Sequence, residues 1–310
     1  LLAEALDRLT FFDEITLRLC PDKPESKTDH FQLTESEVLS FKFKPFQHQI
    51  EGVNFGLDPE RPKWLLLDSM GLGKTNEIIM YAETLKRRGL IDHCMIICGV
   101  DSLRQNWKAE IKKFSTESCI VLGEKISKRG KVSYETVKKR AEILKQPISE
   151  FFVIVNAATL RSDEIVEAFK KGPNKFGLIA VDEVHKFATK TSAQGGNLLK
   201  LGADFKVAAT GTLLINSPLS CYMPLAWTEN DKATLTTFKS QYCEFGGFKD
   251  SQIVGYKNLD TLREEILSCS IRRTLDQVRS DMPTKSVTYE LVEMSDEHRK
   301  FYEAIKEGVK

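Results

Sequence analysis

Short apolar runs alternate with amphipathic segments along most of this chain. The runs lie at 64–67, 94–98, 119–122, 151–155, 178–181 and 206–209. Between most of them apolar residues recur at helical spacing, in segments at 74–88, 102–114, 133–145, 160–170 and 193–201. Strands that alternate with helices are typical of a mostly parallel sheet covered by helices on both faces. The pattern therefore predicts an α/β fold.

The pattern changes outside this alternation and divides the chain into four regions. Residues 1–40 are predicted to form an N-terminal extension and linker, which is polar and carries two prolines after residue 20. The alternating strands and helices occupy 41–216. Residues 217–270 show few strand-like runs and are predicted to form a helical addition to the sheet domain. Residues 271–310 return to an extended stretch at 286–292 and finish in a charged helix.

Length and composition narrow the class of protein. A chain of 310 residues can form one large or two modest domains, and 41% hydrophobic with 29% charged residues is typical of a globular protein. No run of 18 apolar residues exists, so we expect no membrane span and no membrane partner. The seven cysteines include no CxxC pair, which argues against zinc and favours reduced thiols in a cytoplasmic protein. The chain starts at Leu1 rather than Met, so we expect a trimmed fragment.

Positive charge is local rather than general. The net charge is +1, which excludes a strongly basic nucleic-acid binder, but residues 124–145 carry eight Lys or Arg against three Glu. This stretch is either a solvated helix face or a surface patch that lies near a phosphate backbone. In the second interpretation Lys128 and Arg129 are candidates for DNA contact.

The segment from Leu65 to Thr75 carries the strongest chemical signal. An apolar run leads into the turn Met70-Gly71-Leu72-Gly73, and Lys-Thr then opens an amphipathic stretch. This is the layout of a P-loop, in which glycine brings backbone N–H groups close to phosphates. Lys74 would reach the β- and γ-phosphates, and Thr75 would offer its hydroxyl to magnesium. The motif predicts ATP and Mg²⁺ as ligands, although Asp68 stands where GxxxxGK[ST] has its first glycine.

Two carboxylates follow the apolar run at 178–181. Ligands bind at the carboxyl ends of parallel strands, so Asp182 is predicted to hold magnesium and Glu183 to orient and deprotonate water. An Asp-Glu pair can also be solvated surface, but its place after a buried strand favours a Walker B motif. His185 is either a hydrogen-bonded core residue or a group that couples the acids to their surroundings. Together with Lys74, Asp182 and Glu183 form the predicted catalytic set.

A third strand, Val207 to Ala209, leads into the polar turn Thr210-Gly211-Thr212. These hydroxyls can hydrogen-bond to groups at neighbouring strand ends, which would give the turn a coupling role. An ordinary strand–turn is the alternative, and only the two preceding motifs favour the functional interpretation.

The order of these motifs resembles the first RecA-like lobe of superfamily 2 helicase-like ATPases, and within them the Swi/Snf-type DNA translocases. The resemblance covers about residues 41–305. It implies that the segment 44–53 places Gln49 on the adenine edge, and it makes Asp68 expected, because the family also has Asp there. It implies as well that 217–270 is the protrusion of this lobe and that 271–310, with Met282-Pro283-Thr284-Lys285, leads toward an absent second lobe.

The same resemblance suggests where DNA would bind. Asn106 and Trp107 are similar to the family's motif Ia, and Asn156 begins the segment in the position of motif Ib, so Asn106 and Asn156 are candidates for contact with double-stranded DNA. Several residues depart from the family's pattern: Ser69 replaces an acid, Gly99 and Leu213 replace prolines, and Ala188-Thr189 replace Lys-Asn. These departures indicate a divergent branch, of bacterial or phage type.

The resemblance implies an ATP-binding lobe that couples hydrolysis to movement on double-stranded DNA, with an arginine finger from the second lobe completing the site. A strand-separating helicase of the same superfamily remains an alternative. A catalytically silent nucleic-acid-binding scaffold is another, which the intact catalytic set disfavours. A small-molecule kinase is disfavoured because no arginine-rich lid follows Thr75 and the Gln49 segment has no place in it.

Overall fold

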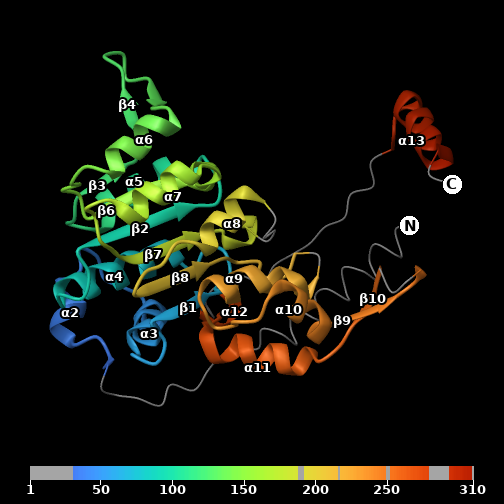
Figure 1. Cartoon of the computed structure of the whole chain (residues 1–310), viewed down its shortest axis with the longest axis horizontal. Helices are drawn as coiled ribbons and strands as arrows, with labels where there is room; N and C mark the ends of the chain where they lie inside the picture. Colours follow the sequence, from blue (N-terminus) through green and yellow to red (C-terminus); the bar gives the residue numbers. More distant parts are fainter. Residues whose placement is uncertain (1–30, 188–191, 216, 249–251, 279–292, 309–310) are drawn as a thin grey trace. The chain divides into compact units, whose positions relative to one another are not determined.

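The computed structural model describes residues 31–187, 192–215, 217–248, 252–278 and 293–308 (Figure 1). The chain divides into a unit at 1–278 and a second unit at 279–310. Most of the predicted N-terminal extension, Ala188-Thr189 and the stretch from Met282 to 292 lie outside the described residues.

A seven-stranded sheet forms the centre of the first unit. Its strands run in the order β11-β1-β8-β7-β2-β6-β3, and every neighbouring pair is parallel. Their bounds are β1 Lys63–Leu66, β2 His93–Cys98, β3 Cys119–Val121, β6 Phe152–Asn156, β7 Phe176–Asp182, β8 Phe205–Ala209 and β11 Ser270–Ile271. Each of the six apolar runs is a strand, so the predicted α/β fold is confirmed.

Helices cover both faces of this sheet (Figure 1). Successive side chains of a strand point to opposite faces, so Trp64 and Leu66 pack in one hydrophobic cluster and Leu65 in the other. The Trp64 side is covered by α3 Gln47–Leu57, α4 Lys74–Arg87 and α5 Leu103–Phe114, and the Leu65 side by α6 Val137–Leu144, α7 Asp163–Lys171 and α8 Ala193–Leu199. Burial on both faces is why the strands are continuously apolar.

Short elements complete the first unit. Among the described residues, the remaining helices are α2 Glu35–Ser40, α9 Tyr222–Trp227, α10 Leu235–Tyr242, α11 Leu259–Cys269 and α12 Leu275–Val278, and the 3₁₀ turns are η2 Ala157–Arg161, η3 Val184–Phe187 and η4 Pro218–Cys221. Helix α2 begins with a capping box, in which Thr34 and Glu37 satisfy each other's backbone N–H groups.

The helix predicted at 133–145 is wrong over its first four residues. Strands β4 Glu124–Ile126 and β5 Val132–Tyr134 form an antiparallel hairpin, and α6 starts only at Val137. Gly130 adopts a φ of +76° in the turn, a conformation that glycine provides at low cost, and Thr136 then caps α6 through its side chain. Strands of three residues are too short to show a clear alternation in the sequence.

The segment 217–270 is helical in α9, α10 and α11, but it also contains a hairpin that its sequence did not predict. Strands β9 Cys243–Gly246 and β10 Gln252–Tyr256 pair antiparallel with an irregularity between Ile253 and Gly255. Glycines inside both strands interrupt the β pattern. The next residues, Ser270 and Ile271, pair with β1, so the segment expected to lead away begins as an edge strand of the central sheet.

The second unit is described from residue 293 and holds helix α13 Asp296–Gly308, in which Arg299 N donates to Ser295 O. Over the described parts of both units, no helix combines the length and apolar character that a bilayer crossing requires.

Candidate functional site

The loops that follow β1, β2, β7 and β8 meet at one edge of the sheet. These four strands are neighbours and parallel, so their carboxyl ends face the same way. The topology therefore gathers the P-loop, Gly99, the Asp182-Glu183 pair and the Thr210 turn, which lie far apart in the sequence.

The P-loop requires its two glycines. Gly71 and Gly73 have φ angles of +86° and +85°, in the left-handed region that strains other residues. A Cβ on Gly73 would also lie 2.4 Å from Nε2 of Gln49. Gly73 is the N-cap of α4, so the loop presents the free N–H groups and positive dipole end of a long helix. This cradle suits a phosphate chain.

Lys74 lies folded against the loop that precedes it. Its Nζ donates to the carbonyl of Asp68 at 2.7 Å and of Ser69 at 3.2 Å. Burial lowers the pKa of Lys74, and the nearby carboxylates of Asp68, Glu183 and Asp182 oppose this shift. The turn of Gly211 comes close, because a Cβ there would lie 3.6 Å from Nζ. Lys74 is thus placed between the P-loop and the acids.

Gln49 joins helix α3 to the P-loop. Its side chain is only 2% exposed: Oε1 accepts from Phe46 N at 3.0 Å, and Nε2 donates to Leu72 O at 3.4 Å. Nε2 of His48 lies 2.8 Å from the same carbonyl. The structure places Gln49 beside Gly73, as the adenine prediction requires, but both amide atoms are engaged within the protein. Contact with a base would therefore require Gln49 to exchange these partners.

Thr75 and Asp182 line one cavity of about 320 Å³, together with Asn106 and Trp107. Asp182 accepts from Trp107 Nε1 at 2.8 Å through Oδ2, and from Glu183 N at 3.0 Å through Oδ1. Burial is the main cause that raises the pKa of Asp182. A hydroxyl and a carboxylate are oxygen donors that Mg²⁺ accepts, so these residues fit the predicted ion.

The contact between Trp107 and Asp182 is a site feature that the sequence did not reveal. Trp107 was placed in a DNA-facing motif, whereas its indole is buried against the cavity. A buried indole N–H usually needs a hydrogen-bond partner, and this was the available signal. The need for a partner could not, however, identify Asp182 among all the hydrogen-bond acceptors of the chain.

Glu183 has an unusual backbone that Gly99 accommodates. Its φ is +54°, and a Cβ on Gly99 would lie 2.7 Å from the Glu183 carbonyl oxygen. Gly99 N also donates to Asp182 O at 2.9 Å. Gly99 stands where the family that the sequence resembles has proline. In this chain the glycine provides space for the Glu183 carbonyl and an N–H donor for the Asp182 carbonyl, neither of which proline could provide.

A hydrogen-bonded cluster links Glu183 to the loop after β8. Nδ1 of His185 lies 3.1 Å from Glu183 Oε2 and 2.8 Å from Thr210 Oγ1. Thr210 Oγ1 accepts from Thr212 N at 3.1 Å, and Thr212 Oγ1 lies 3.4 Å from His185 Nδ1. The hydrogen bond from His185 is the largest cause of the lowered pKa of Glu183. Of the predicted coupling residues, His185 and Thr210 contact the predicted base Glu183, and Thr212 contacts His185 and Thr210.

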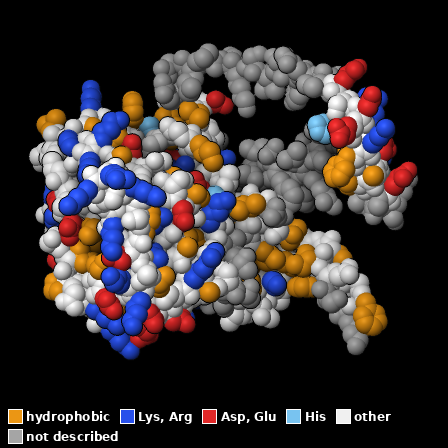
Figure 2. All heavy atoms as spheres, turned by 90° about the horizontal axis from the view of Figure 1, so that it is seen from above, with side chains coloured by type: hydrophobic (Ala, Val, Ile, Leu, Met, Phe, Trp, Pro, Cys, Tyr) orange, Lys and Arg blue, Asp and Glu red, His pale blue; other side chains and the backbone are white. Residues whose placement is uncertain are grey.

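The four candidates for DNA contact are dispersed. Asn156 is 5% exposed; its Nδ2 donates to Asp101 Oδ1 at 2.5 Å, and its Oδ1 accepts from Thr159. Asn106 lines the cavity that Thr75 and Asp182 share. Lys128 and Arg129 are exposed in the turn of the β4–β5 hairpin. Figure 2 looks onto the end from which this hairpin projects and shows basic side chains interspersed with acidic ones.

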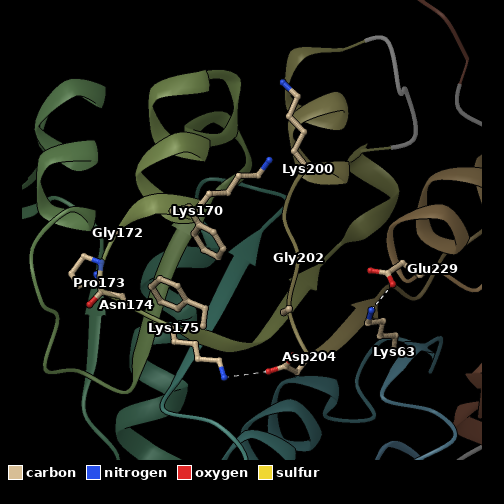
Figure 3. A pocket seen from close by; sticks show the side chains of 13 residues that line it. Lys63, Lys170, Gly172, Pro173, Asn174, Lys175, Lys200, Gly202, Asp204 and Glu229 are labelled. Atoms are coloured by element: carbon tan, nitrogen blue, oxygen red, sulfur yellow. Dashed lines mark hydrogen bonds and ion pairs between the residues drawn. The ribbon is translucent and has the colours of Figure 1, made fainter.

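A larger cavity of about 660 Å³ lies at the opposite, amino-terminal edge of the sheet (Figure 3). Its lysines are partly neutralised, since Lys63 pairs with Glu229 at 2.5 Å and Lys175 with Asp204 at 3.8 Å. None of the predicted motif residues lines it, so it is separate from the candidate site.

The comparisons of this sequence with known proteins agree on one family. The SNF2-related domain matches residues 48–309. The chain is 27% identical over 267 residues to human Chromodomain-helicase-DNA-binding protein 6, covering 84% of this chain and 9% of that protein. It is 26% identical over 309 residues to an uncharacterized ATP-dependent helicase of Mycoplasma pneumoniae, covering 97% of this chain and 27% of that protein. The chain therefore spans a minor part of these relatives.

Solved structures also have a fold similar to that of this chain. The SWI2/SNF2 ATPase core domain of Sulfolobus solfataricus aligns with a TM-score of 0.63 and 20% identity, over 94% of this chain and 56% of that one. The same core in complex with dsDNA aligns with a TM-score of 0.58 and 20% identity, over 78% and 47%. This likeness supports the RecA-like arrangement of the sheet and its helices.

Proposed function

This chain belongs to the family of SNF2-related domains, and we propose that it is the ATP-binding lobe of a DNA-dependent ATPase that moves on double-stranded DNA. One observation carries the proposal: Lys74 lies among Asp68, Asp182 and Glu183, and Thr75 and Asp182 line a common cavity. A silent scaffold would have no need for this arrangement. The relatives matched include proteins described as helicases, which supports the same reaction class and an intracellular location.

In this proposal the P-loop holds the triphosphate. Lys74 would exchange the carbonyls of Asp68 and Ser69 for phosphate oxygens, which are stronger partners for an ammonium group. Thr75 and Asp182 would hold Mg²⁺. The ion would supply positive charge that offsets the negative charge of the triphosphate. Trp107 would keep the Asp182 carboxylate oriented toward the cavity.

Glu183 is the proposed base that orients water. Its contact with His185 favours the ionised carboxylate, which can accept a proton at neutral pH. The shared contacts of His185 and Thr210 would transmit a change at this carboxylate to the loop after β8. This is the basis for the proposed coupling between hydrolysis and movement.

DNA contact is proposed to be mostly with phosphates, which repeat identically along a duplex and suit movement without sequence preference. The solved relative bound to dsDNA supports this class of partner. Exposed Lys128 and Arg129 are the proposed basic contacts. Asn156 would contact DNA only after releasing its hydrogen bonds with Asp101 and Thr159. Asn106 would do so only after leaving the cavity that it lines. A second lobe supplying an arginine finger would complete hydrolysis, since such a residue contributes about 10³–10⁵ in rate.

The test is ATP hydrolysis by this chain with and without duplex DNA, for the wild type, Lys74→Ala and Glu183→Gln. We expect slow turnover by the wild type and its loss in both variants, with binding of ATP retained in Glu183→Gln. Turnover unaffected by either substitution would exclude the proposed site. Full DNA-stimulated turnover by this chain alone would contradict the need for a second lobe.

A further inference from the structure

Arg273 makes a buried junction between the nucleotide site and the segment that follows the protrusion. Its backbone N and its Nε donate to Asp68 Oδ1 at 2.9 and 3.0 Å, and its Nη2 donates to Asp68 Oδ2 at 2.5 Å. The same Nη2 donates to Glu77 Oε2 at 2.7 Å, and Nη1 donates to the carbonyl of His48. One side chain thus contacts the P-loop, helix α4 and helix α3.

The junction is closed to solvent. The side chain of Arg273 is 6% exposed, and those of Asp68 and Glu77 are fully buried. Burial is the main cause that raises the pKa of Glu77 well above its usual value, and the Arg273 guanidinium opposes this shift. Gly52 leaves room for this packing, because a Cβ there would lie 1.8 Å from Glu77 Oε2.

Backbone pairing extends the junction along the P-loop. Leu67 N donates to Ile271 O at 2.8 Å, and Ser69 N donates to Arg273 O at 3.0 Å, continuing the pairing of β1 with β11. The carbonyls of Asp68 and Ser69 are the same groups that receive Lys74. When Lys74 turns to phosphate, the residues that it leaves are therefore those bonded to Arg273.

We propose that Arg273 is a positioning residue that fixes the P-loop relative to helix α3. We also propose that it transmits nucleotide occupancy to the chain after residue 273. This inference rests on the proposed nucleotide site and deepens it. Three features carry it: the two-oxygen contact with Asp68, the contact with the His48 carbonyl, and the backbone bonds at Leu67 and Ser69. A lysine cannot reproduce the planar, two-oxygen contact of a guanidinium.

The experiment measures binding of mant-ATP with Mg²⁺ by the wild type, Arg273→Lys and Asp68→Asn. The matched control is Arg272→Gln, which removes a charge one residue earlier at a side chain that is not fully buried. Hydrogen exchange of the backbone around 271–278 is followed with and without the nucleotide. We expect Arg273→Lys to bind about tenfold more weakly and to lose the nucleotide-dependent slowing of exchange, because only the fork of a guanidinium spans both oxygens. The control should keep both properties.

A merely structural role would lower the melting temperature but leave the affinity and the exchange response of the folded variant unchanged, and that result would overturn the proposal. If Arg273→Lys does not fold, Asp68→Asn decides, because it keeps one acceptor oxygen but replaces the other, which accepts from Arg273, with an amide NH2 that cannot accept. Wild-type affinity and exchange response in Asp68→Asn would equally overturn it. Absence of binding by the wild type would instead refute the nucleotide site itself.

Discussion

The indole Nε1 of Trp107 donates a 2.8 Å hydrogen bond to Oδ2 of Asp182, across 75 residues of sequence. The contact occupies one oxygen of the carboxylate proposed to hold magnesium and leaves the indole buried beside the cavity. Trp107, whose motif is assigned to the DNA side, therefore lines the cavity that Thr75 and Asp182 share.

Trp107→Phe tests this relationship. Phenylalanine retains much of the apolar packing but leaves Asp182 Oδ2 without its donor, which costs on the order of 1–3 kcal/mol when the acceptor is buried. We expect the Mg²⁺ concentration needed for half-maximal ATP binding to rise several-fold. Titration of binding with Mg²⁺ at fixed ATP measures this. An unchanged metal requirement would show that the indole does not position Asp182.

Gly99→Ala probes the backbone of the proposed base. The new Cβ would lie 2.7 Å from the Glu183 carbonyl, a backbone atom that has little freedom to move. We expect the hydrolysis rate to fall by at least tenfold while ATP binding changes less, because the displaced residue is the base and not the P-loop. Gly202→Ala is the control, since a Cβ there meets no atom within 4 Å. Equal effects of the two substitutions would contradict the account.

His185→Ala should change the pH dependence of hydrolysis. The contact with His185 lowers the pKa of Glu183, so in the wild type the base stays ionised to a lower pH. Removing His185 lets that pKa rise, and activity should then be lost at higher pH as the solution is acidified. A pH–rate profile of both proteins measures the shift. An acid limb that stays in place or moves to lower pH would exclude this role.

The hairpin residues Lys128 and Arg129 should contribute to DNA affinity through charge alone. Each phosphate contact on a duplex contributes about −0.9 to the slope of log affinity against log salt. Replacing both residues by Gln should make the slope shallower by up to about 1.8 for any DNA sequence. Binding to duplexes of different sequence at several salt concentrations measures this. The control replaces Lys170 and Lys171, which lie at another site, by Gln. An identical slope in the wild type and the hairpin variant would show that the hairpin does not contact DNA.

The sequence predicted the parts of this fold that local pattern determines. Six apolar runs became strands because burial on both faces requires continuous apolar residues. The glycines of the predicted P-loop, Gly71 and Gly73, adopt the positive φ that glycine allows at low cost. Contacts between distant residues were beyond such reasoning: Arg273 meets Asp68 across 205 residues, and Trp107 meets Asp182 only because β2 and β7 are neighbours. The β4–β5 hairpin was missed because its strands have only three residues each, and the β9–β10 hairpin because both of its strands contain a glycine.

Equilibrium binding of Mg²⁺ and ATP tests the central claim most directly. Titration of mant-ATP into the wild type and Lys74→Ala, each with Mg²⁺ and with excess EDTA, isolates the contributions of the lysine and the metal. The account predicts saturable binding by the wild type that weakens by at least tenfold in Lys74→Ala and on removal of Mg²⁺. Binding that is absent in the wild type, or equal in both proteins with and without the metal, would contradict it.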